Sequence, residues 1–169
     1  MITRRHDDGT TRSKALYSPC LRYRYALTRT WDAQAPRLAF VMLNPSKATE
    51  AANDPTIARC QERARRLGYG ALEVVNLFAW RETDPKALRA APAPVGPETD
   101  ATLLAACARA DLILAGWGFH GAHLGRDAEV TALLRAAGRD LHVLGLTKAG
   151  QPRHPLYISY ATAPQIWTA

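Results

Sequence analysis

Four short apolar runs, separated by segments with helical patterning, constrain the fold of this chain most strongly. They cover residues 38–43, 72–75, 112–115 and 141–146. Continuous apolar runs of this length are typical of strands that are buried on both faces, as in parallel sheets. Helices are predicted between them, over 54–67, from 84, over 98–109 and over 124–137. Strands that alternate with helices predict a mostly parallel sheet with helices on both of its faces.

The N-terminal part of the chain carries a different pattern. Residues 21–31 alternate between apolar and basic side chains, which predicts a strand with one wet face at the edge of the sheet. The expected fold is therefore an α/β protein, a three-layer α/β/α sandwich. Its central sheet is expected to have about four strands plus this added N-terminal edge strand. We expect residues 18–169 to form a single domain, which suits a chain of 169 residues.

Positive charge is concentrated at the N-terminus. The net charge is +7, and residues 1–37 carry eight Lys/Arg against three Asp/Glu. Residues 1–17 are predicted to form a flexible basic arm. An arm of this kind attracts polyanions such as nucleic acid. A merely solvated tail explains the same composition, and both interpretations stay open.

Several classes of protein have little support in the sequence. No apolar run reaches the roughly 18–20 residues of a membrane helix, and residues 1–8 lack the apolar core of a signal peptide. Cys20, Cys60 and Cys107 form no Cys-x-x-Cys pair, so we expect reduced thiols and a cytoplasmic protein. No phosphate loop or dinucleotide fingerprint appears, so no cofactor is predicted. The oligomeric state is left unassigned.

Polar and special residues gather where the predicted buried strands end. In chain order they are Asn44, Pro45 and Ser46; Asn76; Trp117, His120 and His123; and Thr147, Lys148, Gln151, Arg153 and His154. The carboxyl ends of parallel strands lie at one edge of an open α/β sheet, and ligands bind at that edge. We therefore expect four loops to converge on one polar crevice.

Most of these residues also have a purely structural explanation. Asn44 before proline is typical of a capped turn, and Asn76 either braces a loop or recognises a ligand's hydrogen-bonding groups. Trp117 either stacks on a ring or belongs to the core. His120, His123 and Asp127 lack a further strong ligand at matching spacing, so no metal site is predicted. Lys148 and Arg153 are expected to contact anions.

Several motifs together resemble a widespread bacterial family with a domain of unknown function, over residues from about 20 to 160. They are Met42-Leu43-Asn44-Pro45-Ser46, Asp54-Pro55-Thr56-Ile57, Val74-Val75-Asn76-Leu77-Phe78, Thr83-Asp84-Pro85, Gly116-Trp117-Gly118, Gly145-Leu146-Thr147-Lys148 and Pro152-Arg153-His154-Pro155-Leu156-Tyr157. This resemblance implies no particular activity.

The order of the motifs is more distantly similar to the uracil-DNA glycosylase superfamily, whose fold is a three-layer sandwich with a four-stranded parallel sheet. That resemblance implies that Asn44 orients a hydrolytic water, Asn76 recognises the base edge and His154 stabilises the departing base. The chain departs from the pattern in having Asn44 where the most active members have Asp. Ser46 likewise replaces a Tyr found in some members.

Three functions remain as alternatives. The first is hydrolysis of an N-glycosidic bond of a base in nucleic acid, with Phe78 or Trp117 stacked on the ring and Lys148 and Arg153 on phosphates. The second is an enzyme or binding module for a nucleotide or nucleoside in the same crevice. The third is a catalytically silent domain that binds nucleic acid or another protein.

Overall fold

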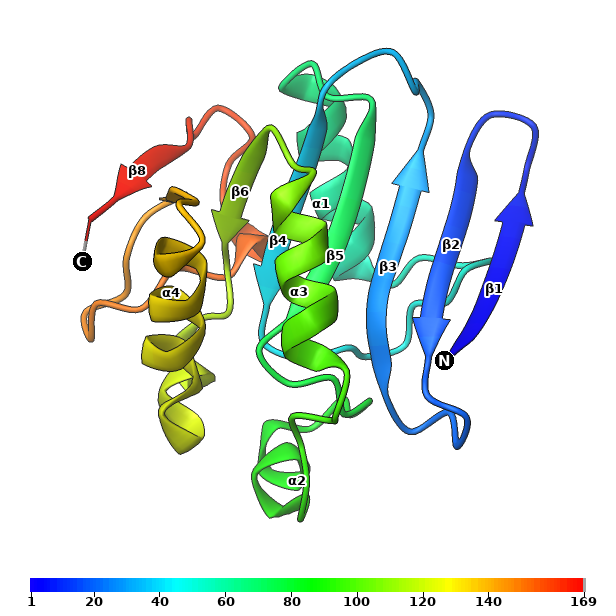
Figure 1. The fold of residues 1–169 in the computed structure, drawn as a ribbon. Helices are drawn as coiled ribbons and strands as arrows, with labels where there is room; N and C mark the ends of the chain where they lie inside the picture. The colour runs from blue at the N-terminus through cyan, green and yellow to red at the C-terminus, as the bar shows by residue number, and fades with distance from the viewer. Residues whose placement is uncertain (169) are drawn as a thin grey trace.

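The computed structural model describes residues 1–168, which form a mixed α/β protein around one eight-stranded sheet (Figure 1). The strand order is β1-β2-β3-β5-β4-β6-β7-β8. The strands are β1 (Ile2–Asp7), β2 (Arg12–Tyr17), β3 (Arg24–Thr30), β4 (Arg37–Met42), β5 (Ala71–Asn76), β6 (Leu112–Ala115), β7 (Leu141–Val143) and β8 (Gln165–Trp167). The helices are α1 (Pro55–Arg66), α2 (Pro85–Ala90), α3 (Thr99–Ala108) and α4 (Arg126–Ala136), with two 3₁₀ turns, η1 (Phe119–Gly125) and η2 (Pro155–Tyr157).

The four apolar runs form four neighbouring parallel strands at the centre of the sheet. β4 pairs in parallel with β5 on one side and β6 on the other, and β6 pairs in parallel with β7. The prediction of an α/β fold with parallel central strands is confirmed. The expected number of strands is wrong, because β1, β2, β3 and β8 extend this centre with antiparallel pairs.

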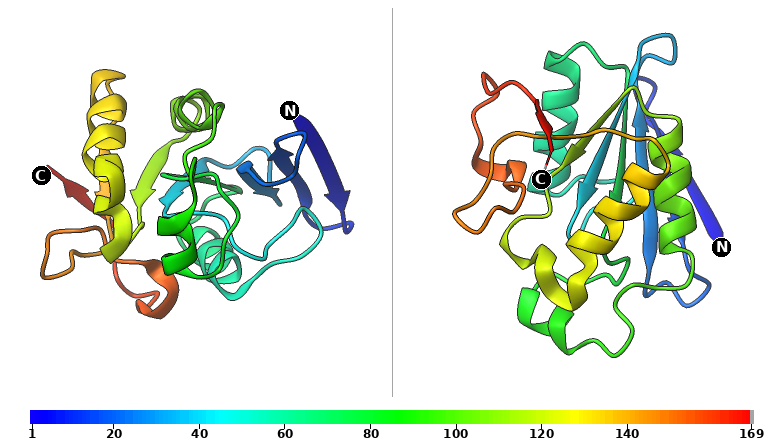
Figure 2. Two further views of the ribbon diagram at one scale, coloured as in Figure 1. Left: turned by 90° about the horizontal axis from the view of Figure 1, so that it is seen from below. Right: turned by 60° about the vertical axis from the view of Figure 1, so that its left-hand side comes forward.

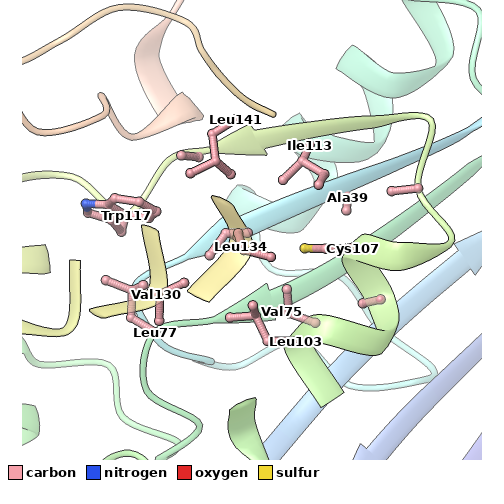
Figure 3. Packing of buried hydrophobic residues seen from close by; sticks show 14 of the residues in the cluster. Ala39, Val75, Leu77, Leu103, Cys107, Ile113, Trp117, Val130, Leu134 and Leu141 are labelled. Atoms are coloured by element: carbon pink, nitrogen blue, oxygen red, sulfur yellow. The ribbon is translucent and has the colours of Figure 1, made fainter. Parts of the chain in front are cut away.

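Helices cover both faces of the sheet (Figure 2). α1 begins where expected, because the Asp54 carboxylate accepts a hydrogen bond from the Ile57 amide at 2.9 Å and Pro55 opens the first turn. The buried side chains of α1 pack on one face with Phe40, Leu72 and Leu114. α3 and α4 close the other face through a second apolar cluster, in which Figure 3 shows Leu103, Cys107, Val130 and Leu134 against strand residues.

The N-terminal region differs from the expectation. Residues 1–17 are not a flexible arm, because β1 and β2 form an antiparallel hairpin. The Asp8 carboxylate accepts hydrogen bonds from Thr10 and Thr11 in the turn, where Gly9 has φ +89°. On β2 the alternate residues Ser13, Ala15 and Tyr17 are buried, which fixes the hairpin on the sheet. Because the residues of this hairpin are largely polar, their alternation does not predict a pair of strands from the sequence alone.

The strand predicted over 21–31 is β3, and it does not lie at the edge. It pairs with β2 on one side and with β5, antiparallel, on the other. Six of its seven residues are buried as a result, including Arg29 and also Arg24, which the alternation placed on a wet face. Within residues 1–168, no helix combines the length and the apolar character needed to cross a membrane.

Candidate functional site

A cleft of about 400 Å³ opens at the carboxyl ends of the parallel strands, which lie at the lower edge of the sheet in Figure 1. The loop after β4 leads to α1 on one face of the sheet, and the loop after the neighbouring strand β6 leads to α4 on the other face. The two loops therefore diverge and leave a gap between the ends of these strands. Clefts in open α/β sheets form at such a point. All four expected loops contribute: the lining residues include Asn44, Ser46 and Asp54; Asn76, Glu82 and Thr83; Trp117, Gly118, Phe119 and His120; and His154 and Leu156.

Asn44 braces the loop after β4 and also faces the cleft. Its Nδ2 donates to the Glu82 carbonyl at 2.7 Å, and the Pro45 and Trp80 carbonyls lie at 3.1 and 3.4 Å. These carbonyls fix the orientation of the amide, because only its nitrogen can donate to them. Oδ1 accepts no hydrogen bond from residues 1–168, so it is the group that Asn44 offers to a ligand or a water.

Asn76 ends β5 at the wall of the cleft. The residue is 3% exposed, and its Nδ2 has no hydrogen-bond partner in the described chain. A buried amide without a partner is costly, and in native proteins it calls for an explanation. The loop-bracing role that the sequence left open for Asn76 therefore has no contact to support it, whereas a ligand acceptor in the cleft would satisfy the amide.

His154 precedes η2 on the loop after β7. Its Nδ1 accepts a hydrogen bond from the Leu156 amide at 3.2 Å, so the neutral ring carries its proton on Nε2. His154 is exposed to solvent on one side, and the protein groups around the rest of the ring desolvate it and lower its pKa below the ordinary value of 6.5, which the negative charge of Asp54 opposes. The ring is therefore a neutral donor at neutral pH.

Gly116 and Gly118, in the segment after β6, allow the loop that carries His154 to pack closely against this segment. A Cβ added at Gly116 would lie 3.2 Å from the Pro155 ring, and one at Gly118 would lie 3.5 Å from the Cβ of His154. Gly118 has φ +74°, a conformation that other residues rarely adopt, and its amide donates to the Pro152 carbonyl at 2.8 Å. The Gly116-Trp117-Gly118 motif thus sets the packing of the His154 loop against β6.

Arg24, Asp54 and Phe119 are among the cleft residues that were not predicted from the sequence. Arg24 enters from the start of β3 and is 2% exposed, and burial lowers its pKa to about 10. Asp54, expected only as a helix cap, presents its carboxylate to the same cleft. Phe119 lies at the rim and is 66% exposed. The signal available for Phe119 was its position directly after Gly118 at the end of a buried strand.

Ser46 and His120 lie in the cleft as the sequence predicted. Ser46 Oγ lies 3.4 Å from Thr83 Oγ1, and His120 Nδ1 lies 3.0 Å from Arg89 Nη2. Pro45, predicted to contact the substrate, is buried and does not line the cleft; its carbonyl accepts a hydrogen bond from the Glu82 amide at 3.0 Å. Residues 1–168 contain no group of three or more His, Cys, Asp or Glu side chains that could hold a metal ion.

Of the remaining predicted residues, only Trp117 reaches the cleft. Phe78 is fully buried in the cluster under α3 and α4. Trp117 contributes to the cleft wall, but its indole donates to Gln151 at 2.8 Å and belongs to the core. Lys148 and Arg153 are exposed on the loop after β7 and are not among the residues that line the cleft. Lys148 and Arg153 were expected to contact an anion in the cleft, and the structure does not place either residue in its lining.

Together, the fold and the cleft define a mixed α/β protein with a pocket at the carboxyl edge of its parallel strands. The chain belongs to the family described as protein of unknown function (DUF1643), whose family model matches residues 24–156. The first and last matched residues, Arg24 and Leu156, both line the cleft. No curated protein matches the chain, and no solved structure matches it.

Proposed function

We propose that the protein hydrolyses the N-glycosidic bond between a nucleobase and its sugar. The observation that carries this proposal is Asn76, a buried amide at the cleft wall whose Nδ2 lacks a partner. The edge of a nucleobase presents hydrogen-bond acceptors and donors side by side, which an asparagine amide can pair with. The resemblance of the motif order to the uracil-DNA glycosylase superfamily supports the same assignment.

The chemistry requires a group that stabilises the departing base. When the C–N bond breaks, its electron pair moves to the base, and positive charge builds on the sugar. Neutral His154 would donate Nε2–H to an oxygen of the base, where negative charge develops. A hydrogen bond to that charge strengthens in the transition state, and the lowered pKa of His154 keeps the donor neutral at pH 7.

The attacking water would be held by Asn44. Its Oδ1 is a free acceptor because Nδ2 is committed to backbone carbonyls. An amide can orient water but cannot take its proton at neutral pH, so the proton released when the water oxygen bonds to the sugar carbon passes to the departing base, which carries the electron pair of the broken C–N bond. The rate is therefore expected to lie below that of an enzyme with a carboxylate at this place. Phe119, exposed at the rim, is the aromatic ring available to stack on the base.

Two substrate classes share this chemistry. A base in nucleic acid must leave the helical stack to enter the pocket. A free nucleotide or nucleoside could enter directly, and 400 Å³ lies in the range of about 300–1,000 Å³ usual for small-molecule sites. Lys148 and Arg153 are exposed and do not line the cleft, so they offer no phosphate contact inside it.

The test is base release, followed by liquid chromatography and mass spectrometry. The substrates are single- and double-stranded DNA and free nucleotides that carry uracil, hypoxanthine, xanthine or hydroxymethyluracil. We expect release from at least one substrate, with a loss of about 100-fold or more in His154→Ala. Tyr157→Ala is the matched control, because Tyr157 follows on η2 and is 90% exposed. Release from none of the substrates, or full activity in His154→Ala, contradicts the proposal.

A further inference from the structure

Arg24 differs from the other buried arginines. Arg24, Arg29, Arg63 and Arg126 are all buried. Arg29 and Arg63 each donate at least three hydrogen bonds, largely to loop carbonyls. Arg126 donates to the Leu77 carbonyl and forms ion pairs with Asp100 and Glu129. Arg24 donates a single hydrogen bond, from Nη1 to the Ala48 carbonyl.

The rest of the Arg24 guanidinium is free. Neither Nε nor Nη2 donates to any group in residues 1–168, and no ion pair there includes Arg24. Leaving a buried charge without a partner is strongly unfavourable. The free donors of Arg24 and the free Nδ2 of Asn76 belong to the same cleft wall. The cleft thus holds a set of buried donors that lack acceptors.

The acids near Arg24 are engaged elsewhere. The Asp54 carboxylate accepts from the Ile57 amide at 2.9 Å and from the Ala48 amide at 3.2 Å. Glu82, also in the cleft, accepts from the amides of Thr83 and Asp84. Arg29 and Arg81 add positive charge near Arg24 and help to lower its pKa, against Tyr17 and Asp54. The cleft thus holds two carboxylates besides Arg24, but neither forms an ion pair with its guanidinium in residues 1–168, so the free donors of Arg24 remain without an acceptor.

We propose that Arg24 forms a phosphate-binding subsite in the cleft and that the ligand is a nucleoside monophosphate. A guanidinium binds phosphate oxygens through two parallel N–H donors, which matches the free Nε and Nη2. The nucleobase part of this inference rests on the function proposed above, whereas the phosphate subsite can be tested without turnover. Because Arg24 is almost wholly buried, the subsite suits a terminal phosphate and not a strand that must pass through it.

The first experiment uses the wild-type protein and inorganic phosphate. Thermal unfolding is followed in phosphate and in chloride at equal pH and ionic strength. A ligand that binds only the folded state raises the unfolding temperature, so phosphate is expected to raise it. Titration calorimetry then compares a nucleoside with its 5′-monophosphate, for which we expect about tenfold tighter binding. No thermal shift, or equal affinity for the two ligands, overturns the subsite.

Variants then assign the effect to Arg24. Arg24→Met should abolish both the thermal shift and the preference for the monophosphate, and Arg24→Lys should keep part of them. Arg22→Met is the matched control, because Arg22 is exposed nearby and does not line the cleft. Full phosphate binding by a folded Arg24→Met protein overturns the assignment. If Arg24→Met does not fold, the thermal shift and the calorimetric titrations of the wild-type protein, together with Arg24→Lys, decide whether the phosphate subsite exists.

Two further arms separate the sources of the phosphate and the two proposals. A 5′-phosphorylated oligonucleotide should bind in the cleft more weakly than the free monophosphate, and equal competition between them overturns the choice of a free nucleotide. Phosphate binding without base release refutes only the proposed hydrolysis. Base release without any preference for the phosphorylated ligand refutes only the subsite.

Discussion

At the scale of single residues, Asn44 and Asn76 show how two asparagines at strand ends serve different purposes. Asn44 donates to loop carbonyls, whereas the Nδ2 of Asn76 has no partner in the described chain. Asn76→Leu should therefore keep or raise the unfolding temperature while lowering base release or ligand affinity about 10- to 100-fold. Asn44→Ala should instead cost about 1 kcal/mol of stability. Comparable thermal destabilisation in both variants would show that Asn76 is a structural brace.

His154 predicts a pH dependence of activity. Its pKa lies below 6.5 because desolvation disfavours the charged ring, so the active neutral form predominates at pH 7. As pH falls through the pKa of His154, the ring gains a proton and its charge, and base release should decline. His154→Asn keeps a neutral donor that does not titrate, so its lower activity should lack this acidic decline. Rates of base release by the wild type and by His154→Asn, measured over about pH 4–8, test this difference. Identical declines at acidic pH in both proteins contradict the role assigned to His154.

At the scale of elements, α1 holds the segment that follows His154. Arg63 donates to the carbonyls of Ile158 at 2.7 Å and Ser159 at 3.1 Å, and the Arg59 guanidinium lies 4.0 Å from the ring centre of Tyr160. Arg63→Met should cost about 1.5–3 kcal/mol and speed amide hydrogen exchange in residues 156–162. Because the same segment carries η2, base release should fall as well.

The control for this prediction lies two residues further along α1. Arg65 is exposed, its guanidinium lies 4.4 Å from the ring centre of Trp31, and its Nη2 donates to the Thr11 hydroxyl at 3.3 Å. Because these contacts are with the N-terminal part of the chain and not with residues 156–162, Arg65→Met should leave hydrogen exchange in residues 156–162 close to that of the wild type. Equal exchange in the Arg63 and Arg65 variants would mean that Arg63 does not hold the segment.

The elements also show how far sequence could predict this structure. The central strands and α1 were predictable because their signals are local: unbroken apolar runs, and Asp-Pro pairs that cap helices. Asn44, Asn76 and His154 followed from their places at strand ends. Arg24 could not be found this way, because its burial depends on β2 and on the loop before α1, which are distant in sequence. The hairpin was missed because its alternation is largely polar.

At the scale of the whole molecule, net charge and cleft make separable contributions to binding. The chain has a net charge of +7 and an isoelectric point near 9.7, so it should bind DNA non-specifically. That affinity should fall steeply between about 50 and 200 mM salt, because binding releases counterions. Binding of a mononucleotide in the cleft should change only several-fold. Affinities measured at both salt concentrations test this, and a DNA affinity independent of salt contradicts it.

The N-terminal hairpin also affects how copies of the chain meet in solution. β1 lies at one end of the sheet with all six residues exposed, among them Arg4 and Arg5. Without the hairpin, the outer strand would be β3, whose buried Tyr25 and Leu27 would border a row of unpaired backbone groups. Such an edge invites aggregation, whereas arginines on an edge strand repel an identical neighbour. The hairpin therefore replaces an aggregation-prone border with a charged one that favours solubility.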